Sequence, residues 1–201
     1  GNGNYHYIDC IEEAERVLVD QLKQTTVTVA KDVKLQVEFN PTKVSEYRLI
    51  GYENRTMAAE DFEDDTKDGG ETGAGQTVTV VYELVRNKDG NTGNDLKYQT
   101  DRELTDAALS NELLTLSIRY KEPDGRRSVE ENFDIIAPAK TSYNLSEDLS
   151  FVAGVVELTM IINNSQYMGD ATLDSAYRLV KNGTADDEAR EELAKMMRSL
   201  R

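Results

Sequence analysis

The sequence predicts an α+β protein in which an antiparallel, immunoglobulin-like β-sandwich is followed by a C-terminal helical subdomain. Residues 25–140 contain about seven short runs of strand pattern separated by turn residues, which is typical of a sandwich. After Pro138 the apolar residues follow a helical period up to the end of the chain. Strands come first and helices later, instead of alternating, and this order distinguishes α+β from α/β proteins. We therefore expect a sandwich over 25–140 and helices over 141–201.

The clearest strand pattern lies in residues 31–55. Apolar residues alternate there with polar ones: Val33, Leu35, Val37 and Phe39 against Lys34, Gln36, Glu38 and Asn40. This period of two predicts a strand with the apolar face buried and the polar face in water. Pro41 places a turn after the strand, and a second apolar run follows over 44–52. We expect the two runs to form a β-hairpin at the centre of an antiparallel sheet.

Further strands are predicted on both sides of this hairpin. Their ranges are Thr25–Ala30, Thr77–Val85, Leu96–Thr100, Leu113–Tyr120 and Ser128–Ile136, with turn chemistry at 88–91 and 123–125. Four tyrosines fall on strands: Tyr47, Tyr52, Tyr82 and Tyr120. We expect their rings to be in the core or half-buried, and outward recognition is the alternative.

The first residues carry the pattern of a strand that leads directly into a helix. Asn4–Ile8 has a strand composition, and Asp9 with Glu12 forms a predicted capping box. Apolar residues then follow at helical spacing: Ile11, Ala14, Leu18 and Leu22. This is half of a β/α unit without the rest of a parallel sheet. We therefore expect residues 1–24 to be the end of a preceding domain.

Three helices are predicted in the C-terminal part. Ser146 caps the first helix. Its apolar residues over 149–162 lie on almost every side of the helix, which predicts burial on more than one side. Thr172 caps the second helix, which Asn182-Gly183 ends. The third covers Asp186–Leu200 and is expected to turn Leu193, Met197 and Leu200 inward.

Composition excludes several classes of function. The formal net charge of −15 argues against nucleic acid and against anionic membrane surfaces, because both require clustered Lys and Arg. No run approaches the roughly 20 apolar residues that cross a bilayer, so we expect no direct membrane insertion. Cys10 is the single cysteine, which rules out an internal disulfide and a cysteine-based zinc site.

An unusually acidic stretch follows the hairpin over residues 60–71. Seven carboxylates crowd into it and Lys67 alone opposes them, so we expect a long surface loop, with a flexible hinge where glycines follow. Two interpretations stay open. The loop is either simply solvated, or it forms a calcium or glycan site, because calcium takes several oxygen ligands in flexible geometry. The calcium ligands would be Asp61, Asp64, Asp65, Asp68 and Glu71.

Catalysis has little support in the sequence. His6 is the single histidine and has no nucleophile or orienting carboxylate in a surrounding motif, so a structural role is expected. The glycine-rich run at 69–75 lacks the Lys-Ser/Thr ending of a phosphate-binding loop. We therefore expect no enzyme and no cofactor, apart from the calcium hypothesis.

The stretch KDVKLQVEFNPTKVSEYRLIGYENR at 31–55, with EDFEDDTKDGGETGAGQTVTVVYEL after it, resembles the C-terminal region of bacterial YfbK-type proteins that carry a von Willebrand factor type A domain. LLTLSIRYKEPDG and SEDLSFVAGVVELTMIINNS are similar to the same family. The resemblance implies that residues 1–24 are the last strand and helix of the type A domain. These residues contain no Asp-x-Ser-x-Ser cation motif, so the adhesion site of such domains is not expected here.

The resemblance also sets the functional expectation. It implies a non-catalytic scaffold or interaction module in the bacterial cell envelope, exported to the periplasm or anchored at the surface. The expected partners are the upstream type A domain and an unidentified protein. The cation- or glycan-binding loop is the alternative function.

Overall fold

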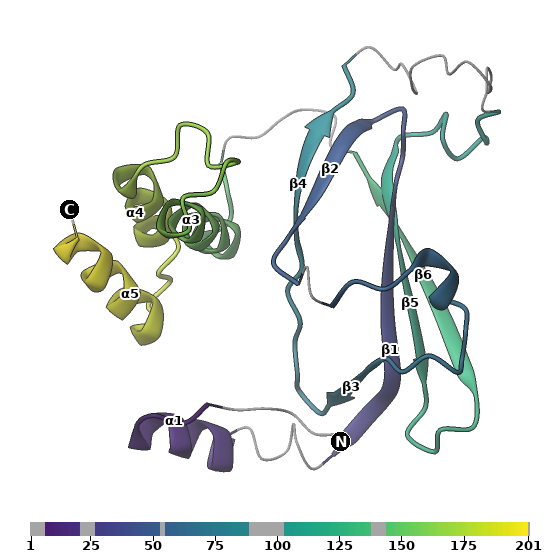
Figure 1. Ribbon diagram of the computed structural model, residues 1–201, viewed down its shortest axis with the longest axis horizontal. Coiled ribbons are helices and arrows are strands. Elements are labelled where there is room, and N and C mark those ends of the chain that lie inside the picture. The colour runs from purple at the N-terminus through teal and green to yellow at the C-terminus, as the bar shows by residue number, and fades with distance from the viewer. Residues whose placement is uncertain (1–6, 21–26, 53–54, 89–102, 138–143, 201) are drawn as a thin grey trace. The chain divides into compact units, whose positions relative to one another are not determined.

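The computed structural model describes residues 7–20, 27–52, 55–88, 103–137 and 144–200. The chain divides into two compact units, Gly1–Ala137 and Pro138–Arg201, which are described separately below. The first holds antiparallel sheets and the second holds helices (Figure 1). The α+β class with C-terminal helices is confirmed. The predicted boundary between sandwich and helices, at residues 140 and 141, lies outside the described residues.

The N-terminal helix differs from its prediction. Helix α1 (Ile11–Glu15) continues into the π-helical turn η1 (Arg16–Asp20). Its N-cap is Cys10, which is extended with φ −140° and makes no side-chain capping bond. The predicted capping box is wrong because the helix begins one residue later than a cap at Asp9 requires. The predicted strand Asn4–Ile8 lies mostly outside the described residues, as does Leu22, and the described residues 7 and 8 belong to no strand.

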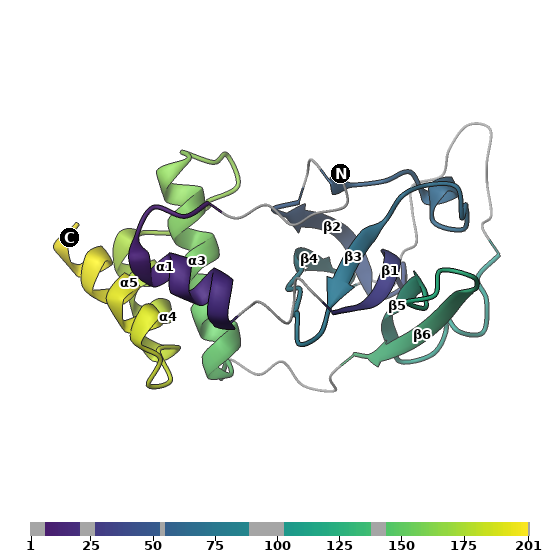
Figure 2. The same cartoon turned by 90° about the horizontal axis from the view of Figure 1, so that it is seen from below.

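Six described strands form two antiparallel sheets. The larger sheet has the order β3-β1-β5-β6 and the smaller one pairs β2 with β4 (Figure 2). Their bounds are β1 Thr28–Phe39, β2 Val44–Ile50, β3 Gly70–Gly73, β4 Val81–Arg86, β5 Glu112–Lys121 and β6 Ser128–Ile136. The predictions for β5 and β6 are confirmed, whereas β4 begins later than predicted. The predicted strand Leu96–Thr100 lies outside the described residues.

The predicted hairpin is wrong, because β1 and β2 belong to different sheets. The chain changes sheet at the corner that follows Asn40. The Asn40 amide Nδ2 donates to the carbonyl oxygens of Ala108 and Glu112 at 3.1 and 2.8 Å. Thr42 Oγ1 donates to the same Ala108 oxygen at 2.8 Å. These bonds hold the corner to the segment before β5, so β1 pairs with β5 and β2 turns away to β4.

Strand β1 is longer than predicted, and it joins the expected strand at 25–30 with the one at 33–39. Asp32 lies at the junction with φ +50°, where the pairing with β3 and β5 is irregular. Strand β3 replaces the predicted glycine-rich hinge. Gly70 and Gly73 pair with Val33 and Thr28 of β1, so this part of the acidic loop is an edge strand.

Aromatic rings join the two sheets. The Phe39 ring of β1 lies 4.6 Å from the Tyr47 ring of β2 and 5.2 Å from the Tyr82 ring of β4, between ring centroids. Tyr82 and Tyr120 are half-buried as expected. Tyr47 and Tyr52 are exposed, so the expected burial is wrong for these two. The immunoglobulin-like form of this two-sheet arrangement stays a prediction.

The helical unit contains α3 (Glu147–Ile162), α4 (Leu173–Asn182) and α5 (Glu188–Ser199). The predicted caps are confirmed, since Ser146 accepts from the Leu149 amide and Thr172 from the Ser175 amide. Gly154 lets α3 approach α4, because a Cβ there would lie 2.6 Å from the Val180 nitrogen. The buried core consists of Leu158, Ala176, Val180, Ala194 and Met197.

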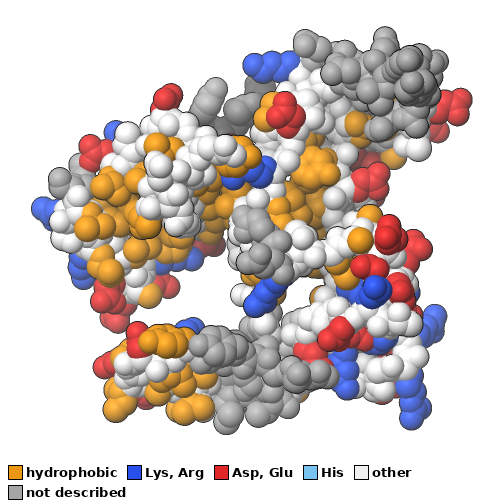
Figure 3. Space-filling model, viewed as in Figure 1, with side chains coloured by type: hydrophobic (Ala, Val, Ile, Leu, Met, Phe, Trp, Pro, Cys, Tyr) orange, Lys and Arg blue, Asp and Glu red, His pale blue; other side chains and the backbone are white. Residues whose placement is uncertain are grey.

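Two predictions about helix burial are wrong. In this unit α3 buries a single stripe, Ser150, Gly154 and Leu158, instead of several sides. Leu149 and Ile162 are exposed on it, and Leu200 is exposed at the end of α5. Hydrophobic side chains therefore reach the surface of the helical unit (Figure 3). Among the described helices, none combines the length and the apolar character that crossing a bilayer requires.

Candidate functional site

The register of the larger sheet gives it one polar and one apolar face. Residues that pair across β1, β5 and β6 point to the same side. The apolar rows are Leu35–Ile118–Glu131, Val37–Leu116–Phe133 and Phe39–Leu114–Ile135. The polar rows are Lys34–Arg119–Glu130, Gln36–Ser117–Asn132 and Glu38–Thr115–Asp134. The two faces have different chemistry, so each is a separate candidate site.

The acidic segment 61–69, called the strap below, is bound to the polar face through Lys34. The Lys34 ammonium donates to the main-chain oxygen of Asp61 at 3.1 Å and to that of Asp64. The Lys34 side chain is only 4% exposed, and Phe62 of the strap is buried as well. The sequence pattern placed Lys34 in water. That prediction is wrong because the strap covers this end of the polar face.

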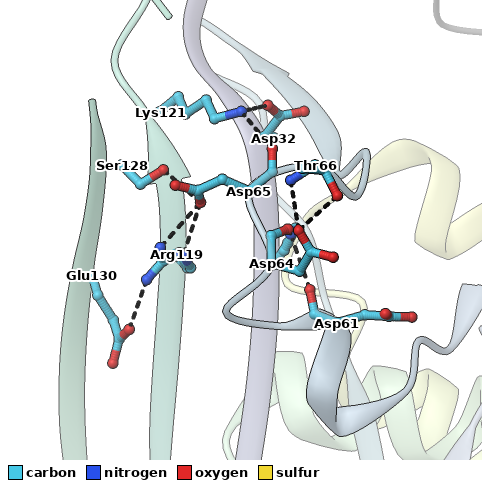
Figure 4. Close-up of polar contacts among 10 residues, drawn as sticks. Asp32, Asp61, Asp64, Asp65, Thr66, Arg119, Lys121, Ser128 and Glu130 are labelled. Atoms are coloured by element: carbon cyan, nitrogen blue, oxygen red, sulfur yellow. Dashed lines mark hydrogen bonds and ion pairs between the residues drawn. The ribbon is translucent and has the colours of Figure 1, made fainter. Parts of the chain in front are cut away.

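A second set of contacts ties the strap to β5 and β6. Asp65 Oδ1 accepts from Arg119 Nη2 at 3.0 Å and from Ser128 Oγ at 2.8 Å. Arg119 also reaches Glu130 of β6, with Nη1 3.3 Å from Oε2. One carboxylate of the strap is therefore bound to both neighbouring strands of the sheet (Figure 4).

The end of the strap lies against the irregular part of β1. Asp32 Oδ2 accepts from the Lys121 ammonium at 2.6 Å, and Lys121 also donates to the Asp65 main-chain oxygen at 3.1 Å. Gly69 fits there because it has no side chain. A Cβ at Gly69 would lie 2.5 Å from the Asp32 carbonyl carbon, which is closer than real atoms approach.

These contacts change the acidity of two carboxyl groups. The hydrogen bond from the Lys121 ammonium lowers the pKa of Asp32 below its ordinary value of 3.8. Burial opposes it with a smaller effect, and the Gly69 amide adds to the lowering. Hydrogen bonds from Ser128 and then Arg119 lower the pKa of Asp65. Both groups stay ionised at neutral pH, and neither has the raised pKa that a general acid needs.

The five predicted calcium ligands are not brought together. Asp61 pairs with Lys67 at 3.4 Å, Asp64 accepts from Thr66 in a local turn, and Asp65 binds Arg119. Asp68 and Glu71 are exposed, and Glu71 lies on β3. Within the described part of the chain, no three His, Cys, Asp or Glu side chains are grouped as metal ligands. The calcium site therefore stays a prediction from the sequence, and no carboxylate cluster among the described residues supports it.

The apolar face is only partly covered. The Phe39 ring contacts the Tyr47 and Tyr82 rings of the smaller sheet. At the other end of the row Phe39–Leu114–Ile135, the Ile135 side chain is exposed. Ile135 is 45% exposed, Phe133 is 44% exposed and Leu35 is 41% exposed. The prediction that Leu35 is buried is wrong, because β2 and β4 cover only the corner end of this face. The alternation in 128–136 could have located the patch, since Phe133 and Ile135 share one side of that strand.

The remaining candidates contribute little to either face. Cys10 is exposed and unpaired with any other cysteine. The prediction for His6 falls outside the described residues. Since Asp61, Asp64 and Asp65 of the strap are engaged by cations or hydroxyls, the arrangement on the polar face can hold a loop in place. The apolar face can bind another surface.

An antiparallel sheet with a strapped polar face and a partly exposed apolar face, followed in the chain by three helices, defines a two-part α+β protein. A family model described as "Uncharacterized protein YfbK, C-terminal" matches residues 24–201. The chain therefore belongs to the family of YfbK C-terminal regions, and the resemblance stated above is confirmed.

One curated relative is the uncharacterized protein YfbK of Escherichia coli (strain K12). It is 37% identical to this chain over 187 residues, which is 93% of this chain and 32% of the relative. The chain thus spans about a third of the length of that relative. No solved structure matches the chain.

Proposed function

We propose that the chain is a non-catalytic protein-interaction module of an exported bacterial envelope protein, and that it binds the type A domain preceding it. The observation that carries this proposal is the open apolar face at β6. Phe133 and Ile135 are neighbours on one side of that strand and are nearly half exposed. Grouped apolar side chains at a surface commonly mark a protein-binding site.

Burying this face would supply part of the energy of a domain contact. Burying a large apolar side chain completely contributes about 1.5–3 kcal/mol, so covering the exposed halves of Leu35, Phe133 and Ile135 would contribute about 3 kcal/mol together. Additional contacts at the rim would supply specificity. The energy from the apolar face alone is too small to hold two separate components together, so the interaction also requires rim contacts that bring their affinity into the measurable range.

The length of the relative supports an occupant within the same protein. About two thirds of the relative lies beyond the part that this chain matches. The type A identity of that region and the envelope location rest on the family resemblance. The immunoglobulin-like form of the sandwich rests on the strand pattern of residues 25–140. The non-catalytic role is supported by the strap, whose acids Asp61 and Asp65 form ion pairs with Lys67 and Arg119.

The test uses the preceding region of the full-length protein and this chain as two purified components. The variant Phe133→Ser with Ile135→Thr reduces the apolar area and keeps residues that tolerate a strand. We expect it to weaken binding at least about tenfold, which corresponds to 1.4 kcal/mol. The matched control is Asn132→Thr, on the polar side of the same strand, which is expected to bind as the natural chain does.

Isothermal titration gives the affinities. Absence of binding between the two natural components, or equal affinity for the double variant and the control, would contradict the proposal. Circular dichroism of each variant shows whether the sheet is intact.

A further inference from the structure

The outer side of β6 is an edge of the larger sheet. In the order β3-β1-β5-β6, the strand pairs with β5 on one side, and none of the other described strands pairs with its outer side (Figure 2). β6 has nine residues, and all those from Glu130 to Ile136 are exposed. The other edge, β3, has only four residues. An exposed edge of this length presents main-chain donors and acceptors to which an extended segment can pair.

The charges on β6 are of one sign. The strand carries Glu130, Glu131 and Asp134 and contains no Lys or Arg. Glu130 is paired with Arg119, but the other two accept from neutral hydroxyls. Glu131 accepts from Tyr120 Oη at 2.9 Å and Asp134 from Thr115 Oγ1 at 2.8 Å. These bonds orient the two carboxylates and leave their charges to be balanced by a partner.

From this edge, and resting on the interaction function proposed above, we propose that β6 accepts an extended, basic strand from its partner by β-strand addition. Residues directly opposite each other share a face of the sheet. The added strand therefore carries apolar residues opposite Phe133 and Ile135, and Lys or Arg opposite Glu131 and Asp134. In an antiparallel strand this gives the order apolar, basic, apolar, any residue, basic.

A second copy of the chain is the less favourable occupant. Pairing β6 with itself would bring three carboxylates on each strand against three on the other, and like charges across a strand pair are destabilising. Edge carboxylates thus select against self-association and in favour of a basic strand.

The experiment measures amide hydrogen exchange of this chain with a synthetic peptide that contains Val-Lys-Val-Thr-Lys flanked by threonines. The matched control peptide has glutamate in place of each lysine. We expect the basic peptide to slow exchange in β6 and the acidic peptide to leave it unchanged. Added salt is expected to weaken the protection by the basic peptide, because the pairing is partly electrostatic.

A charge-reversal variant makes the test specific. The double variant Glu131→Lys with Asp134→Lys is expected to reverse the preference between the two peptides. The acidic peptide should then protect the β6 amides from exchange, and the basic peptide should not. If that variant fails to fold, Glu131→Gln with Asp134→Asn is expected to reduce protection by the basic peptide. Equal protection by both peptides, protection outside β6 only, or none at about millimolar peptide would overturn the proposal.

These outcomes are distinct from failure of the interaction function. If the preceding region binds and the Phe133/Ile135 variant weakens it, while no peptide protects β6, the interaction function stands and strand addition is wrong. If neither the region nor the peptides bind, both are wrong.

Discussion

The contact between Gly69 and Asp32 gives the sharpest test of how the strap is held. In Gly69→Ala the new methyl group would lie 2.5, 2.8 and 2.9 Å from the carbonyl carbon, carbonyl oxygen and Cα of Asp32. All three are main-chain atoms, so no side-chain rotation relieves the overlap. The strap or the irregular part of β1 has to move, which weakens the bond between Asp32 and Lys121. Overpacking of this kind costs about 1–3 kcal/mol.

The adjacent Gly70→Ala is a matched control. A Cβ there meets only the Val33 carbonyl oxygen at 3.8 Å, which is ordinary contact. Alanine in place of glycine in a strand is neutral or stabilising by up to about 1 kcal/mol. We expect urea denaturation followed by circular dichroism to show a lower free energy of unfolding for Gly69→Ala than for Gly70→Ala. A difference below about 0.5 kcal/mol, the usual scatter of surface substitutions, would refute the close approach.

Other consequences of the same contacts can be measured separately. Lys34→Met removes the ammonium that two strap carbonyls share and is expected to destabilise by about 1–3 kcal/mol in urea, whereas Lys67→Met, which removes an exposed ion pair, costs at most about 1 kcal/mol. The lowered pKa values of Asp32 and Asp65 stabilise the chain above the ordinary value of 3.8, and this stabilisation is lost as pH falls through the lower folded values. We expect the free energy of unfolding to decrease between neutral pH and about pH 3. We expect a smaller decrease in the double variant Asp32→Asn with Asp65→Asn. Gly183→Ala is expected to lower the melting temperature of the helical unit, because its Cβ would lie 2.5 Å from the Phe151 nitrogen, and an unchanged melting temperature would contradict that packing.

Local signals in the sequence predicted much of the local structure, although the capping box at Asp9 was wrong. Ser146 and Thr172 cap their helices as expected, because a cap depends on residues only three positions away. The β6 range is confirmed in full and β5 within one residue at each end. The family membership is also confirmed, and it depends on long matching segments instead of single residues.

Features that depend on distant residues were missed. Lys34 looked solvated because its partners, the carbonyls at 61 and 64, lie 27 and 30 positions away. The prediction of a hairpin was wrong for the same reason, because hydrogen bonds from Asn40 to residues 108 and 112 decide where the chain turns. The cations that bind Asp65 and Asp32 come from β5, so the acidic segment alone suggested a calcium site.

The central claim is that the apolar face at β6 is covered in the full-length protein. It is tested most directly by the reaction of an Ile135→Cys side chain with a maleimide, in a Cys10→Ser background, because the natural Cys10 is exposed and would react. We predict labelling at least about tenfold slower in the full-length protein than in this chain alone, with Asn132→Cys labelled at similar rates in both. Equal labelling of Ile135→Cys in the two proteins would contradict the account.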